Sequence, residues 1–266
     1  MKRGLGSLEA QFFAYVQMRR LQVVSTAQIA KALRLTPTQE RKLLSRLSRA
    51  RLIARVRRGL YLVPPRLPLG GVWTPDEALA LTTLVGDRGG RFQICGPNAF
   101  NRYGFSEQIP ARVYAYNNRL SGQRTVGSVT LMLIKVCTDR LGETETVRNA
   151  EGVETLYSSR ARTLVDAVYD WARFNSLPKA FDWIRRDLKT GRTKPADIVR
   201  IARRYGDVGT IRRIGVLLER EGVSPALLRT LERALPGSRS LIPWIPTRPR
   251  RGRIDRRWGV IQNDRD

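Results

Sequence analysis

The 266-residue sequence contains no histidine and only two cysteines, Cys95 and Cys137. The absence of histidine excludes zinc fingers with histidine ligands, histidine general bases, and Ser-His or Cys-His nucleophilic sites. Two cysteines are too few for a disulfide framework, and such residues are more often small core side chains than a redox pair. Any enzyme built on this chain would have to work with carboxylates, lysines or hydroxyl groups.

Acidic residues and long apolar runs are also scarce. The chain has 23 Asp and Glu against 49 Lys and Arg, which gives a formal net charge of +26. Such a charge attracts polyanions in a salt-dependent way, and nucleic acid is the usual polyanion. No run of apolar residues is long enough to span a bilayer, and no signal-peptide core precedes the first predicted helix. We expect a cytoplasmic protein with no membrane partner.

The positive charge is concentrated near the N-terminus. Residues 1–66 hold fifteen Lys and Arg but only two Glu, which is half of the excess charge in a quarter of the chain. A second cluster lies near the C-terminus, and we interpret it as a solvated tail, with a second phosphate contact as the alternative. It consists of Arg248, Arg250, Arg251, Arg253, Arg256 and Arg257.

Two capped helices follow one another within residues 25–49. Ser25 and Gln28 form a capping box for the first helix, and Arg34-Leu35 is the predicted turn. Thr36–Gln39 forms a second capping box, with proline at the first helical position where its missing N–H does no harm. The second helix buries a leucine stripe made of Leu43, Leu44 and Leu47.

The second of these helices is the candidate recognition helix. With the leucines inward, its solvent side could lie in a major groove of DNA, where Thr38, Gln39, Lys42 and Arg46 would meet base edges and phosphates. The predicted DNA-binding positions on this helix are Thr38, Gln39, Arg41, Lys42, Ser45, Arg46 and Arg49.

A short β-hairpin is predicted directly after the recognition helix. Residues 52–56 and 60–63 flank Arg57-Arg58-Gly59, where glycine is free to take positive φ, and Pro64-Pro65 ends the hairpin. This hairpin would be the wing of a winged helix-turn-helix, with the helix Leu8–Met18 packed beneath. We expect Arg55, Arg57 and Arg58 to contact DNA backbone or minor groove.

The predicted fold class is α+β. An N-terminal winged helix-turn-helix in residues 1–66 is followed by a Pro- and Gly-rich linker, 67–71, and a larger mixed α/β domain, 72–266, with a helical back half. A capped helix is expected to start at Thr74–Glu77 and to run through Leu84. We expect strands at 92–95, 112–116, 129–136 and 153–157, then helices at 161–171, 177–188, 196–205, 208–220 and 225–235. Two late strands are expected at 241–245 and 258–262.

Candidate chemistry outside the basic region is weak, and we predict no catalytic residues, no metal and no cofactor. Leu133-Ile134-Lys135 has the lysine of a nuclease strand without its acids. Gly96-Pro97-Asn98 could hold a phosphate, but it lacks the spacing of a dinucleotide loop and is interpreted as a strand-to-helix turn. The aromatic residues Trp171, Phe174, Phe181 and Trp183 are interpreted as core packing, with partner docking as the alternative.

Two adjoining stretches, Leu47–Ile53 and Arg55–Tyr61, resemble the winged-helix signature of AbiEi antitoxins. The resemblance continues through residues 159–166, 212–219 and 257–260, so it spans most of the chain. The wing motif is shared with other winged-helix regulators, whereas its combination with the C-terminal pattern is more restrictive. The glycine common before the wing is Arg51 here, and positive φ at this residue would cost roughly 1 kcal/mol.

The resemblance implies a function for each domain. In AbiEi antitoxins the N-terminal domain represses the toxin-antitoxin operon by binding promoter repeats, and the C-terminal domain counters a nucleotidyltransferase toxin. We therefore expect a non-enzymatic repressor and antitoxin, with double-stranded DNA and a nucleotidyltransferase toxin as partners. Two alternatives stay open: a winged-helix regulator with an effector-binding C-terminal domain, and a DNA-processing enzyme targeted by its winged helix.

Overall fold

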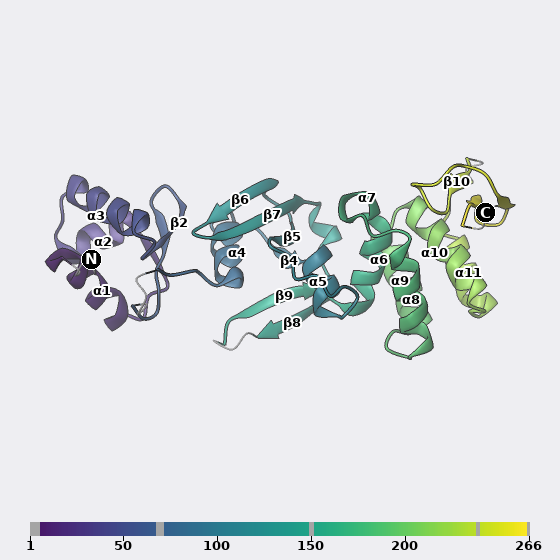
Figure 1. Ribbon diagram of the computed structural model, residues 1–266, viewed down its shortest axis with the longest axis horizontal. Helices are drawn as coiled ribbons and strands as arrows, with labels where there is room; N and C mark the ends of the chain where they lie inside the picture. Colours follow the sequence, from purple (N-terminus) through teal and green to yellow (C-terminus); the bar gives the residue numbers. More distant parts are fainter. Residues whose placement is uncertain (1–5, 68–71, 149–151, 238–239, 265–266) are drawn as a thin grey trace. The chain divides into compact units, whose positions relative to one another are not determined.

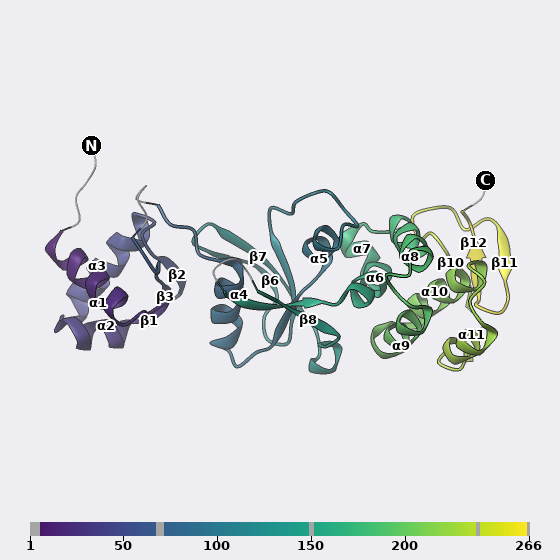
Figure 2. The ribbon, with the colours of Figure 1, turned by 90° about the horizontal axis from the view of Figure 1, so that it is seen from below.

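The computed structural model describes residues 6–67, 72–148, 152–237 and 240–264, and their fold is α+β (Figures 1 and 2). The chain forms two compact units. The first comprises Met1–Phe92, Ala111–Leu141 and Val147–Thr155, and the second comprises Gln93–Pro110, Gly142–Thr146 and Leu156–Asp266. Residues 68–71 of the predicted linker lie outside the described residues, so the division at 67–71 stays a prediction.

The first unit begins with six short elements, which we call the N-terminal module (residues 7–63). Three helices, α1 (Ser7–Met18), α2 (Thr26–Leu33) and α3 (Pro37–Arg49), enclose a core that includes Phe12, Phe13, Ile29 and Leu47. The strands β1 (Val23–Ser25), β2 (Ala54–Arg57) and β3 (Leu60–Leu62) form an antiparallel sheet in the order β1-β3-β2. The short strand β1 has no expected counterpart from the sequence, because three residues are too few for an alternating pattern.

Each helix of the N-terminal module is followed by an arginine in the left-handed region. Arg20 after α1 has φ of 51°, Arg34 after α2 has φ of 52°, and Arg51 after α3 has φ of 57°. At the end of α3, the N–H of Arg51 donates to Ser48 O at 3.1 Å and the N–H of Leu52 donates to Leu47 O at 3.0 Å. This closure satisfies the last carbonyls of the helix but needs positive φ at a residue with a Cβ. The expected strain at Arg51 is therefore present.

Replacing Arg51 with glycine should stabilise the N-terminal module by roughly 0.5–1 kcal/mol, because removing the left-handed penalty outweighs the entropy that glycine loses on folding. Native-state hydrogen exchange of the buried Phe12 and Leu47 amides measures this change. The control Arg41→Gly, inside α3, should destabilise the module by about 0.5–1 kcal/mol. Destabilisation by both substitutions would contradict strain at Arg51.

The rest of the first unit is a small sheet with one helix. Asp76 caps α4 (Glu77–Gly86) by accepting the N–H of Leu79 at 3.0 Å, at the predicted start of this helix. The strands β5 (Val113–Asn117), β6 (Gly122–Val126) and β7 (Val129–Lys135) pair in the order β6-β7-β5, with β5 parallel and β6 antiparallel to β7. A 3-10 turn, η1 (Thr138–Arg140), follows. Strand β6 was not expected, because its residues are mostly exposed and polar.

Helix α5 (Gly96–Arg102) belongs to the second unit, and the strands β4 (Phe92–Ile94), β8 (Thr144–Arg148) and β9 (Glu154–Ser158) have residues in the ranges of both units. Ile94 of β4 pairs in parallel with Tyr157 of β9. Gly96 has φ of 55°, and a Cβ there would lie 2.5 Å from the Phe174 ring. From the sequence, Gly96-Pro97-Asn98 is interpreted as a strand-to-helix turn, whereas the structure has it as the tightly packed first turn of α5.

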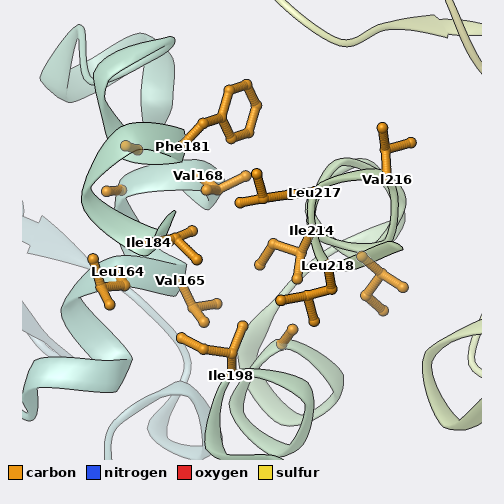
Figure 3. Packing of buried hydrophobic residues seen from close by; sticks show 14 of the residues in the cluster. Leu164, Val165, Val168, Phe181, Ile184, Ile198, Ile214, Val216, Leu217 and Leu218 are labelled. Carbon is orange, nitrogen blue, oxygen red and sulfur yellow. The ribbon is translucent and has the colours of Figure 1, made fainter. Parts of the chain in front are cut away.

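Helices form most of the second unit. They are α6 (Arg160–Tyr169), α7 (Trp171–Phe174), α8 (Lys179–Lys189), α9 (Pro195–Tyr205), α10 (Val208–Arg220) and α11 (Pro225–Glu232). Figure 3 shows Ile214 and Leu217 of α10 pointing toward α6 and α8, where they meet Val168 and Ile184. Phe181, one of the four aromatic residues considered for docking, is buried and stacks on Trp244 with 4.6 Å between ring centroids.

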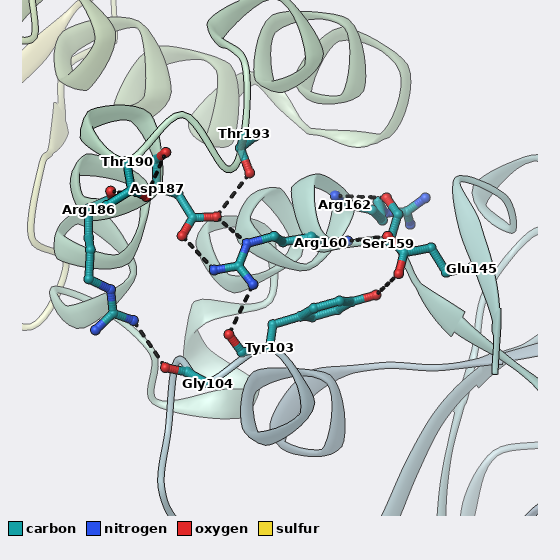
Figure 4. A network of polar contacts seen from close by, with 10 residues as sticks. All are labelled: Tyr103, Gly104, Glu145, Ser159, Arg160, Arg162, Arg186, Asp187, Thr190 and Thr193. Carbon is teal, nitrogen blue, oxygen red and sulfur yellow. Dashed lines mark hydrogen bonds and ion pairs between the residues drawn. The ribbon is translucent and has the colours of Figure 1, made fainter. Parts of the chain in front are cut away.

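A buried ion pair joins α6 to α8 (Figure 4). Arg160 donates to both oxygens of Asp187, at 2.6 and 2.7 Å, and to the carbonyl of Tyr103 at 3.0 Å. Asp187 is fully buried and also accepts the Thr193 hydroxyl at 2.9 Å. Burial and a hydrogen bond to Glu145 raise the pKa of Tyr103. Because every polar group here has a partner, the network holds the helices together without leaving a buried charge unpaired.

The chain ends in a three-stranded sheet beside α10. Strands β10 (Ile242–Pro243), β11 (Arg253–Asp255) and β12 (Val260–Gln262) lie in the order β10-β12-β11. Buried Trp244 and Trp258 attach this sheet to the helical core. No helix among the described residues is long and apolar enough to cross a membrane.

Candidate nucleic-acid interface

Helix α3 separates its apolar residues from its cationic residues. Leu43, Leu44 and Leu47 are each at most 1% exposed, as the leucine stripe predicts. The predicted DNA-binding positions lie on the opposite side. Thr38, Gln39, Arg41, Lys42, Arg46 and Arg49 are exposed, and Ser45 is half-buried.

The open side of α3 and the β2–β3 hairpin together form a groove of about 750 Å³. Arg41 and Arg49 line it from α3, Arg55 lines it from β2, and Arg58 lines it from the turn between the strands. None of these four side chains has a carboxylate partner among the described residues. Uncompensated cations in a concave surface produce a strong positive potential. The fold therefore brings the predicted helix and hairpin positions into one surface, which we call the arginine groove.

The tip of the hairpin is held against the start of α2. The N–H of Thr26 donates to the carbonyl of Gly59 at 3.1 Å. Gly59 has φ of 81°, and a Cβ there would lie 3.3 Å from the Thr26 hydroxyl. Glycine is thus needed both for the turn and for this close approach. The contact fixes where Arg58 stands relative to α3.

Arg57 departs from the predicted hairpin tip. The register shifts between Arg55 and Arg57, so Arg57 pairs with Leu60 as the last residue of β2, and the turn is shortened to Arg58-Gly59. Its guanidinium donates to both oxygens of Asp87, at 2.6 and 2.5 Å. This ion pair raises the pKa of Arg57 and lowers the pKa of Asp87. Arg57 is therefore already paired with a carboxylate thirty positions away in the sequence, which no local pattern predicts.

Two further predicted positions have partners inside the N-terminal module. Arg46 forms an ion pair with Glu9 of α1, with 2.5 Å between Nε and Oε1. The Gln39 side chain accepts the N–H of Thr36 at 2.9 Å and closes the predicted capping box. The amide nitrogen of Gln39 remains the group that it could offer to a base edge.

Glu40 is a residue of this surface that the sequence analysis missed. It lines the arginine groove but is only 6% exposed, and it accepts the N–H of Ala30 at 2.9 Å. Burial raises the pKa of Glu40, and the hydrogen bond from Ala30 partly opposes this rise. The bond joins the end of α2 to the first turn of α3. Its spacing of ten residues is outside the range of local helix patterns, so only the folded chain reveals it.

Substitution of Glu40 tests this link. Glu40→Ala should destabilise the N-terminal module by about 1–3 kcal/mol, because it removes the hydrogen bond that links the Ala30 N–H of α2 to α3 and leaves the space of a buried side chain unfilled. Glu40→Gln keeps an acceptor oxygen and removes the desolvated charge, so it should cost much less. Hydrogen exchange of the Ile29 and Leu44 amides measures both variants. Equal losses would show that the carboxylate acts through its charge and not through this hydrogen bond.

The described residues contain no group of three or more His, Cys, Asp or Glu side chains that could hold a metal ion. Comparison with known protein families and with curated proteins finds no match. Comparison with solved structures finds the crystal structure of the RV2827C protein from Mycobacterium tuberculosis. The match has a TM-score of 0.63 and 14% sequence identity, and it covers 97% of this chain and 92% of that one. At this identity the likeness shows a common fold.

Proposed function

We propose that the N-terminal module is a winged helix-turn-helix that binds double-stranded DNA through the arginine groove. The observation that carries this proposal is the set of four uncompensated guanidinium groups contributed by α3 and the β2–β3 hairpin. Guanidinium groups suit phosphate because their donors form a planar fork. An exposed helix beside a cationic hairpin is also the geometry in which winged-helix proteins meet the two grooves of a duplex.

The residues divide into two roles under this proposal. Arg55 and Arg58 contact the sugar-phosphate backbone and set the affinity, whereas Thr38 and Lys42 lie in the first turns of α3, the part of a recognition helix that meets base edges. Arg46 and Arg57 contribute less than the sequence predicts, because Glu9 and Asp87 already occupy their side chains. DNA phosphates would have to displace those carboxylates.

We further propose that the protein is a transcriptional repressor and antitoxin of the AbiEi type. The resemblance of residues 47–61, with its continuation in the second unit, supports this proposal. The N-terminal module would bind repeats in its own promoter, and residues 72–266 would counter a nucleotidyltransferase toxin.

The groove is tested by Arg55→Ala/Arg58→Ala in the full chain. We expect weaker binding to promoter and random duplexes alike, with a salt dependence, d log K/d log[salt], that is shallower by about 2. Fluorescence anisotropy over a salt series measures both quantities. The matched control is Arg19→Ala/Lys31→Ala, which removes the same charge from exposed positions outside the groove. Equal losses in the two variants would mean that net charge, and not the groove, attracts DNA.

Growth rescue tests the antitoxin proposal. The proposal predicts that a nucleotidyltransferase toxin is encoded beside this gene, and that cells expressing this toxin survive when the full chain is co-expressed. The groove variant Arg55→Ala/Arg58→Ala should rescue almost as well when both genes are under external promoters, because repression then plays no part. Failure of the full chain to rescue would remove the antitoxin proposal and leave the DNA-binding proposal standing.

A further inference from the structure

The C-terminal arginine cluster is not a solvated tail, because Arg253 lies in β11 and the other arginines lie in the loop before this strand and the turn after it. Asn263 is 4% exposed and fixes the loop that carries the cluster. Its amide donates to the carbonyls of Ile245 and Pro249, at 3.0 Å each, and its oxygen accepts the N–H of Ile245 at 2.9 Å. Gly252, with φ of 144°, passes so close to the Gln262 carbonyl that a Cβ would not fit.

The arginines of this segment fall into two groups. Arg257 donates to Glu219 and Glu232, at 2.6 and 3.0 Å, and Arg248 donates to the carbonyl of Asp264 at 3.1 Å. The other four have no hydrogen bond or ion pair of their guanidinium groups among the described residues, and all four are exposed. They are Arg250, Arg251, Arg253 and Arg256.

The neighbouring carboxylates cannot neutralise the second group, because other groups already hold them. Asp255 accepts the N–H of Trp258 and the side chain of Gln262, both at 3.1 Å. Asp264 binds Arg220 at 2.7 Å, and Glu219 binds Arg257 together with the Trp258 indole. Arg253 and Arg256 thus line an open cleft of about 720 Å³ beside α10 as uncompensated cations.

Four like charges held within seven residues repel one another, and this repulsion opposes folding. The structure nevertheless holds their backbone in place with the Asn263 hydrogen bonds, the tight passage at Gly252 and two buried tryptophans. A tail that served only solubility would not need these contacts to hold its backbone in one conformation. The ordered geometry points to a polyanionic ligand.

We propose that residues 250–256 form a second nucleic-acid contact, in which the guanidinium groups of Arg250, Arg251, Arg253 and Arg256 bind backbone phosphates. Guanidinium forks match phosphate oxygens. A nucleic-acid backbone is favoured over an acidic protein as the ligand, because protein interfaces need an apolar core. Within the described part of residues 246–264, Ile254 is the one large apolar side chain that is exposed, at 48%. This site lies in the second unit and does not depend on the arginine groove.

The test uses the full chain with Arg251→Ala/Arg253→Ala, both in the wild type and in the Arg55→Ala/Arg58→Ala background. The background variant separates this site from the groove. The matched control is Lys189→Ala/Arg192→Ala, which removes the same charge from exposed positions at the end of α8. Anisotropy over a salt series is recorded with a duplex DNA and with a hairpin RNA of equal length, so that the two sources of phosphate are distinguished.

In the Arg55→Ala/Arg58→Ala background, Arg251→Ala/Arg253→Ala should lower the affinity for at least one of the two nucleic acids by roughly tenfold and reduce the salt slope by about 2. The control pair should change the slope by clearly less. A loss of affinity for the DNA alone identifies a second operator contact, and a loss of affinity for the RNA alone identifies an RNA-binding surface. The proposal would be overturned if Arg251→Ala/Arg253→Ala and the control pair changed affinity and salt slope equally. It would also be overturned if Arg251→Ala/Arg253→Ala affected binding to neither nucleic acid. Circular dichroism, with a Tm no lower than that of the wild type, confirms that the variants fold.

Discussion

The shortage of carboxylates is the constraint on which the arrangement of this protein depends. With 23 acids for 49 basic residues, more than half of the cations cannot find an anionic partner within the chain. Pairing is therefore selective. Several carboxylates pair with a guanidinium inside the fold, and two groups of four arginines without a carboxylate partner among the described residues lie close together, one in the arginine groove and one in residues 250–256.

The internal pairs show what those few carboxylates do. Arg162 and Asp166 are both at most 1% exposed, and Arg162 also lies 3.8 Å from the centre of the Tyr205 ring. Within the described part of the chain, buried Arg213 has no ion pair with a carboxylate, and it donates to the carbonyls of Pro243 and Trp244, at 3.2 Å each. Its burial lowers the pKa of Arg213. Such groups are costly to bury unless every donor is satisfied, so they also fix the positions of the segments that satisfy them.

The sequence correctly predicts several features that depend on local chemistry. Helix α10 has the predicted bounds, the capping residues Thr36 and Asp76 begin their helices as expected, and the Leu43, Leu44 and Leu47 stripe is buried. At Arg51 the sequence leaves open whether the helix ends with positive φ or in a different shape, and the structure has the positive φ. These features depend on neighbours within a few residues.

Other features depend on residues far apart in the sequence and could not be predicted. Asp87 meets Arg57 across thirty positions, and Glu40 meets Ala30 across ten. The short strand Arg253–Asp255 carries no alternating pattern, and its order depends on Asn263, which looks in the sequence like an ordinary polar residue. From the sequence alone, the C-terminal arginines are therefore interpreted as a tail, whereas in the structure the hydrogen bonds of Asn263 hold the loop that carries them.

The central claim is that α3 and the β2–β3 hairpin together form the surface that meets DNA. Hydrogen–deuterium exchange of the full chain, with and without a duplex from its own promoter, tests this claim most directly, because it locates the bound surface without any substitution. With the duplex bound, we expect slower exchange at the exposed first turn of α3 and at the Arg58-Gly59 turn. Protection confined to segments outside residues 36–59, with these two unchanged by the duplex, would contradict it.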